Sequence, residues 1–122
     1  MKVKVARDDV YVPKWRDNRK LPETEQIKVY FKYMTAAQEE RFTIFKPKYN
    51  DDKTDKVDIE IIVDEVAVWN ECVTKIEGLV DEKTGKPITL PSVVSEMPHS
   101  YQLITEVTAY IRRNLEGEER KN

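Results

Sequence analysis

The sequence predicts an α+β fold in one small domain, with an N-terminal antiparallel β-hairpin followed by three to four α-helices. Two patterns carry this prediction. Apolar residues alternate with polar ones, as on a strand with one buried face, at Ile27, Val29, Phe31 and Tyr33. Apolar residues recur at intervals of three and four, as on an amphipathic helix, at Ile104, Val107, Ile111 and Leu115. The length of 122 residues suits a single domain.

Residues 1–34 are expected to form the hairpin region. Val3 and Val5 alternate with lysines, and Val10 and Val12 continue the apolar pattern until Pro13 ends it. The polar, turn-rich residues 14–25 then connect this segment to the strand at 26–33. The pattern indicates an antiparallel pair with a long loop.

Residues 35–117 are expected to be mainly helical. Thr35 and Gln38 have the spacing of a capping box, which predicts a helix from Ala36 to about Phe45 with Phe42 and Phe45 inside. Pro47 would end that helix, and the charged segment 46–56 is interpreted as a mobile loop.

The segment 57–76 carries two patterns at once. Val57, Ile59 and Ile61 alternate as on a strand, whereas a stripe including Val66, Trp69 and Val73 follows a helical period. The length of the run favours a helix that ends at Gly78, although its β-branched residues favour a strand.

The remaining segments are shorter. Residues 81–85 predict a turn, Ser92 caps a short helix, and Ser100 opens a last helix that Gly117 ends. The domain is therefore expected to span 1–117, and residues 118–122 to form a disordered tail.

Charge and composition exclude several classes of partner. The 21 Lys and Arg nearly balance the 23 Asp and Glu, so no basic face for nucleic acid is expected. No apolar run is long enough to span a membrane, and Met1–Lys4 lacks the apolar segment of a signal peptide. The lone Cys72 fits a reducing cytoplasm.

No catalytic residue, cofactor site or metal site is predicted. Thr84-Gly85-Lys86 resembles the end of a phosphate-binding loop, but Val80 and Pro87 stand where that motif needs Gly and Ser or Thr. The acidic segment 50–55 lacks the glycine and the bidentate Glu of a calcium loop. Cys72 and His99 are the one chemically possible nucleophile and base pair, but no third, orienting group is evident. The chain is therefore expected not to be an enzyme.

Candidate residues for protein interaction are Trp15, Ile27, Val29, Phe31 and Tyr33. Trp15, in a polar loop, either anchors that loop to the core or contacts a partner. The apolar face of the strand at 26–33 is expected to be covered by a second copy or by a client protein, so the chain is expected to form a homo-oligomer.

The chain resembles the tail assembly chaperones of long-tailed bacteriophages and prophages. The resemblance rests on Val12-Pro13-Lys14-Trp15, Asp17-Asn18, Leu21-Pro22-Glu23, the segment 25–29, and the segment 73–79 with Asp81 and 85–88 after it. It implies a non-enzymatic protein in the cytoplasm of the bacterial host, which binds the tape measure protein and the major tail protein during tail assembly.

Two alternatives remain open at this point. The chain could be a structural component retained in the tail or neck of the virion, because composition does not separate such a component from a chaperone. It could also be a small enzyme that uses Cys72 and His99, if their side chains met in a cleft.

Overall fold

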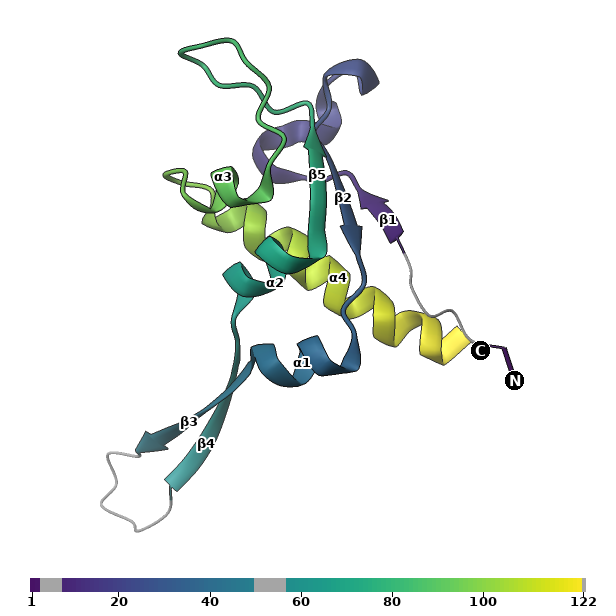
Figure 1. Ribbon diagram of the computed structural model, residues 1–122, viewed down its shortest axis with the longest axis vertical. Helices are drawn as coiled ribbons and strands as arrows, with labels where there is room; N and C mark the ends of the chain where they lie inside the picture. The colour runs from purple at the N-terminus through teal and green to yellow at the C-terminus, as the bar shows by residue number, and fades with distance from the viewer. Residues whose placement is uncertain (3–7, 50–56, 122) are drawn as a thin grey trace.

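The computed structural model describes residues 1–2, 8–49 and 57–121, and it describes no side chains at 48–49, 57–58 and 114–121 (Figure 1). The strands are β1 Asp8–Tyr11, β2 Lys28–Lys32, β3 Thr43–Tyr49, β4 Val57–Val63 and β5 Val73–Glu77. The α-helices are α1 Ala36–Phe42, α2 Glu65–Cys72, α3 Pro91–Ser95 and α4 Tyr101–Lys121. Two 3-10 helices, η1 Trp15–Lys20 and η2 Glu23–Glu25, lie between β1 and β2. The predicted α+β class is confirmed.

The chain divides into a body and an arm. In the body, β1, β2 and β5 form an antiparallel sheet with β2 at its centre, and α4 crosses one face of this sheet (Figure 1). The arm is the separate antiparallel pair β3–β4, which projects away from the body below α1 (Figure 1). The predicted N-terminal hairpin is present as β1–β2, although Val3 and Val5 lie outside the described residues.

The core of the body lies between β2 and α4. Val29 and Phe31 on β2 are at most 1% exposed, and they belong to one buried cluster with Leu103, Ile104, Val107 and Ile111 of α4. Ile27 and Tyr33, at the ends of the strand, are each 8% exposed. The sequence predicted that a partner covers this strand face, and in this structure the amphipathic stripe of α4 covers it.

Asn18 explains why the long connection between β1 and β2 is ordered. Its side chain is buried, donates to the carbonyls of Pro13 and Ile27, and accepts from the N–H of Ile27 at 2.7 Å. One amide therefore ties η1 to Pro13 before it and to Ile27 just before β2, and it satisfies backbone groups that burial would otherwise leave unpaired.

The first α-helix is shorter than predicted. Both hydrogen bonds of the Thr35–Gln38 capping box are present, which confirms its start. The helix ends at Phe42, however, and Phe45 lies on β3 with 66% of its surface exposed instead of inside. Pairing with β4 draws the chain into a strand at the β-branched Thr43, so residues 46–49 of the expected loop are also strand. Residues 50–56 lie outside the described part.

The predicted helix over 57–76 is wrong. The segment forms β4, the helix α2 and then β5. Asp64 accepts a hydrogen bond from the N–H of Ala67 and starts α2 in the middle of the expected helix. Both sequence patterns were real: the alternation applied to β4, and the helical period applied to α2. In the segment 35–117, which was expected to be mainly helical, the strands β3, β4 and β5 lie among the four α-helices.

Gly78 follows β5 and ends no helix. Its φ is +83°, and a Cβ there would lie 2.3 Å from the carbonyl oxygen of Gln26, so only glycine fits at this position.

Later in the chain, the turn at 81–85 is confirmed. The short helix begins at Pro91 with Leu90 as its cap, whereas Ser92 was the expected cap. Backbone of α4 continues past Gly117 to Lys121, so neither the predicted end nor the disordered tail at 118–121 is seen.

Candidate interaction surface

The arm has one apolar face and one mixed face. Cross-strand partners on the first face are Thr43 with Val63, Phe45 with Ile61, and Pro47 with Ile59. The partners that alternate with them, Ile44 with Ile62 and Lys46 with Glu60, belong to the opposite face. The name "arm face" is used below for the surface of Thr43, Phe45, Pro47, Ile59, Ile61 and Val63.

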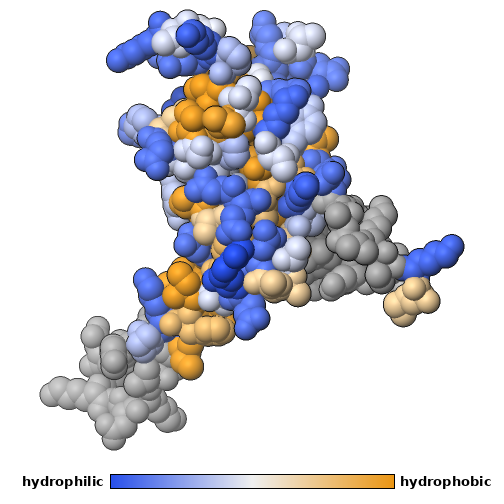
Figure 2. Space-filling model, in the orientation of Figure 1, coloured by the Kyte–Doolittle hydropathy of each residue, from blue (hydrophilic) through white to orange (hydrophobic). Residues whose placement is uncertain are grey.

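The outer part of the arm face is solvent-exposed. Phe45, Ile59 and Ile61 expose 66%, 68% and 65% of their surface. Figure 2 shows apolar surface gathered over the stem of the arm, beside charged surface. Single exposed apolar residues are ordinary, but three neighbours on one strand pair form a patch of the kind that marks an interaction site.

A groove continues the arm face into the body. A hollow of about 400 Å³ lies where α1, the base of the arm and α4 meet, and both apolar and polar side chains line it. Its lining includes Met34, Phe42, Ile61, Val63 and Ala109. Ile61 and Val63 belong both to this groove and to the arm face, so the groove and the arm face adjoin.

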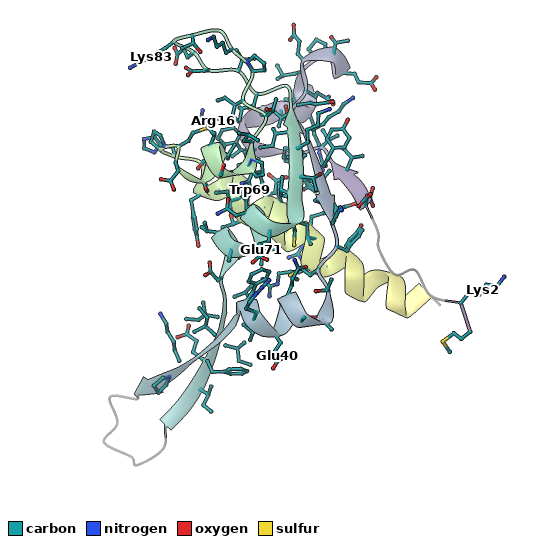
Figure 3. The ribbon with its side chains drawn as sticks, in the orientation of Figure 1. Lys2, Arg16, Glu40, Trp69, Glu71 and Lys83 are labelled. Atoms are coloured by element: carbon teal, nitrogen blue, oxygen red, sulfur yellow. The ribbon has the colours of Figure 1, made fainter. Side chains whose placement is uncertain are left out.

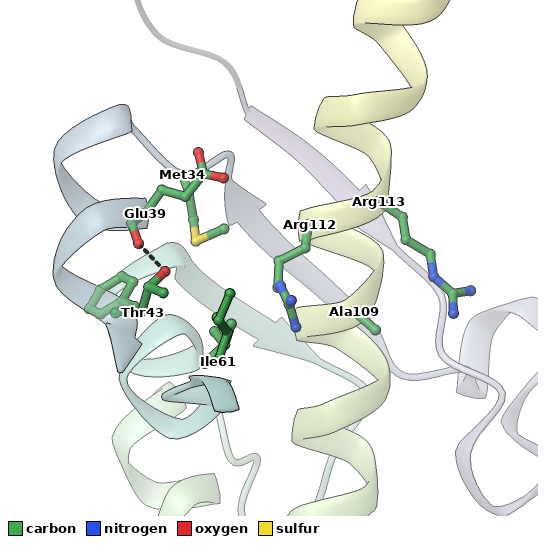
Figure 4. A pocket seen from close by; sticks show the side chains of 9 residues that line it. Met34, Glu39, Thr43, Ile61, Ala109, Arg112 and Arg113 are labelled. Atoms are coloured by element: carbon green, nitrogen blue, oxygen red, sulfur yellow. Dashed lines mark hydrogen bonds between the residues drawn. The ribbon is translucent and has the colours of Figure 1, made fainter. Parts of the chain in front are cut away.

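Charged side chains surround the groove on two sides. Glu39 lines it from α1, and Arg112 reaches in from α4 toward Ile61, while Arg113 lies on the outer side of that helix (Figure 4). Both arginines are exposed, and neither forms an ion pair with another residue that the structure describes. Apolar side chains beside exposed cations favour an apolar segment that also carries acidic residues.

Trp15 lies in a second, shallower hollow. About 670 Å³ in volume, it is lined by Trp15, Arg16, His99, Tyr101 and Gln102. Trp15 is half-buried and packs against the core cluster, and the Arg16 guanidinium lies 4.3 Å from the centre of its ring. The packing favours the anchoring role for Trp15, while its remaining exposed surface leaves contact with a partner open.

Cys72 and His99 are placed in different surroundings. Cys72 is buried at the end of α2, and burial first, then the nearby Glu71 carboxylate, raises the pKa of its thiol to about 11. His99 is exposed and borders the Trp15 hollow. A thiol that stays protonated in the core is a poor nucleophile.

Other titratable groups serve the fold. Burial and a hydrogen bond to Glu106 raise the pKa of Tyr11 to about 12, and the same carboxylate accepts from the N–H of Lys14 at 2.7 Å. On the outer face of the sheet, Lys75 and Tyr30 both donate to Glu77 and lower its pKa. Within the described residues, no group of three or more His, Cys, Asp or Glu side chains is placed to hold a metal ion.

Sequence reasoning missed the arm face because it assigned these residues to two helices and a loop. The signal was present in the alternation of Val57, Ile59 and Ile61, but nothing in the sequence indicated that Phe45 would pair with Ile61.

No α-helix among the described residues is long and apolar enough to cross a membrane. Comparison of the chain with protein-family models, curated proteins and solved structures gives no match.

Proposed function

We propose that this chain is a non-enzymatic tail assembly chaperone of a long-tailed bacteriophage or prophage. It would bind the tape measure protein and the major tail protein during tail morphogenesis, in the cytoplasm of the bacterial host. The motifs around Trp15 and the segments 73–79 and 85–88 supply the family resemblance. The observation that carries the proposal is the exposed apolar arm face, which adjoins a groove lined by apolar and charged side chains.

This surface suits a protein that holds a client. Exposed Phe45, Ile59 and Ile61 can cover apolar side chains of a client, and Arg112 and Arg113 can pair with its acidic residues. The arm projects from the body, so a client segment can lie along it without disturbing the core (Figure 1). The occupant we assign is an amphipathic segment of a tail protein with acidic residues beside its apolar positions.

Binding is tested by co-expression with a tape measure protein and a major tail protein from the same genome. We expect both to copurify with the chain, and Phe45→Ser to lower the recovered client at least tenfold. Lys46→Ser is the matched control, since it places the same residue at the adjacent position on the opposite face. Equal recovery with the two variants would show that the arm face is not the client site.

The composition of finished particles separates a chaperone from a retained component. A chaperone leaves before the tail is complete, so mass spectrometry of purified virions should not detect this chain. Its presence in stoichiometric amount would replace the proposal with a structural role in the tail or neck.

A further inference from the structure

Hydrogen bonding at the base of the arm fixes which backbone groups point outward. Each strand of the arm has one neighbour in the described structure, so each has an unpaired outer edge. The N–H of Asp64 donates to the carbonyl of Phe42 at 2.9 Å, so these two residues, which adjoin the pair Thr43–Val63, are hydrogen-bonded to each other. Because bonded and non-bonded pairs alternate along antiparallel strands, Phe45–Ile61 and Pro47–Ile59 are non-bonded pairs.

The position of Pro47 agrees with this assignment. Proline has no N–H and is tolerated in a paired strand where that group would point away from the partner. The N–H groups of Ile59, Ile61 and Val63 therefore point to the outer edge of β4, while the equivalent row on β3 is interrupted at Pro47. One edge of the arm is open along its length and the other is blocked.

An open, apolar edge strand is a template for another strand. We infer that β4 pairs with β4 of a second copy, antiparallel about a two-fold axis, and joins the two arms into a four-stranded sheet. A lone two-stranded ribbon is marginally stable in water, so each arm gains from this pairing. The blocked edge of β3 stops further addition, so the assembly closes as a dimer and does not grow into a fibre.

The sequence of β4 favours one register, with Ile61 opposite Ile61 of the other copy. This register pairs Ile59 with Val63 across the axis and aligns their outward N–H and C=O groups. It sets Glu60 opposite Ile62, whereas an axis at Glu60 would place two carboxylates directly opposite each other. A two-fold axis perpendicular to the sheet also puts both arm faces on the same side. The dimer then presents one apolar surface twice as wide.

Sedimentation velocity between about 1 and 200 μM tests the dimer. We expect a concentration-dependent dimer in the unmodified chain. Ile61→Pro removes an outward N–H from the β4 edge and should weaken dimerisation at least tenfold. Phe45→Pro removes the equivalent group from the β3 edge and should leave dimerisation within about twofold, because the two residues are cross-strand partners in the same kind of pair. A monomer across this range, or equal weakening by both variants, would overturn the inference.

Disulfide trapping gives a second measurement that does not depend on how proline is tolerated. Ile61→Cys places thiols opposite each other at the axis, within the reach of a disulfide, whereas the thiols of Phe45→Cys would lie on outer strands. Both variants are made with Cys72→Ala. Mild oxidation should give a covalent dimer with Ile61→Cys only, and equal trapping of both would contradict edge pairing.

This inference and the proposed function can fail separately. A chain that stays monomeric but copurifies with tail proteins would overturn the dimer and leave the chaperone role standing. A dimer trapped at Ile61 that recovers no tail protein would leave the edge pairing standing and contradict the proposed function.

Discussion

The body and the arm both contain antiparallel strands with one apolar face, and they differ in what covers that face. On β2, Val29 and Phe31 are buried beneath α4, whereas on the arm Phe45 and Ile61 remain largely exposed. The strands themselves are of similar apolar character. The difference comes from the helix that crosses one sheet and not the other (Figure 1).

This comparison shows that alternation in a sequence identifies an apolar face but not its partner. A face covered within the chain contributes to folding, and the same kind of face left uncovered is available for binding. Substitutions in the body should therefore change stability, while those in the arm should change association.

Phe31→Ala should have the largest effect on stability. Phe31 is 1% exposed, so truncation leaves a cavity in the core and should lower the free energy of unfolding by about 3–5 kcal/mol. Phe45→Ala removes the same atoms from an exposed site and should change it by less than about 0.5 kcal/mol. Urea denaturation followed by tryptophan fluorescence compares the two, and losses of similar size would mean that the arm face is covered within the monomer.

Gly78→Ala should come next. The added Cβ would meet the Gln26 carbonyl at 2.3 Å on top of the strain of φ +83°, so a loss of about 2–4 kcal/mol is expected. Gly85→Ala also introduces a side chain at positive φ, but nothing lies within 4 Å of that Cβ, and it should cost about 1–2 kcal/mol. Thermal unfolding measures both, and a Gly85 variant that is the less stable of the two would reject the steric argument.

Asn18→Ala tests how the connection between β1 and β2 is held to the body. It removes one acceptor and two donor bonds and leaves the N–H of Ile27 buried without its partner, which should cost about 1–3 kcal/mol. Asn70→Ala on the exposed side of α2 is the control and should be nearly neutral. Hydrogen exchange should also quicken at Ile27 in the Asn18 variant, and unchanged protection there would contradict the anchoring role.

Alkaline pH should weaken the body through Cys72 and Tyr11. Their pKa values are raised by folding, from 9.0 to about 11 and from 10.0 to about 12, so the unfolded chain loses these protons first. Stability is therefore complete below pH 9 and declines as pH rises toward about 12. Cys72→Ala should make the melting temperature less dependent on pH between 9 and 11, and an unchanged slope would show that the thiol is not protected.

Arg41→Gln should have the smallest effect. Its guanidinium lies 2.6 Å from the Glu71 carboxylate and links α1, at the base of the arm, to α2 in the body. Figure 3 labels Glu71 on α2, above α1. Both side chains are well exposed, so the pair should contribute less than about 1 kcal/mol, and high salt should remove that contribution. A double-mutant cycle with Glu71→Gln measures it, and a coupling energy insensitive to salt would argue for a more rigid junction.

Local signals in the sequence predicted several elements correctly. The Thr35–Gln38 capping box, the strand centred on Val29 and the amphipathic helix after Ser100 all depend on contacts within a few residues. The prediction for the segment 57–76 failed because both periodicities fit it, and the Asp64 cap that divides it was not recognised in the sequence. The helix predicted to reach Phe45 failed because pairing with β4, a contact distant in sequence, overrode the local preference.

The candidate site was less predictable than the fold. Trp15 was identified from residue type, and the structure places it half-buried beside a hollow. The strand face at Ile27–Tyr33 was chosen as an interaction surface because it shows the clearest apolar and polar alternation in the chain. In the structure, that alternation reflects burial of the face within the chain. By that reasoning Phe31→Asp should prevent folding of the body and not merely weaken association.

The sequence by itself determined the α+β class, the Thr35–Gln38 capping box, the turn at 81–85 and the periodicity of the apolar faces of β2 and α4, because these follow from backbone geometry and neighbouring residues. Only the tertiary structure decided that α4 covers β2, that Phe45 meets Ile61, and that one edge of the arm is open while Pro47 blocks the other. Those outcomes depend on which segments contact each other in space. A segment is buried only when another segment packs against it, so its own sequence does not decide its burial.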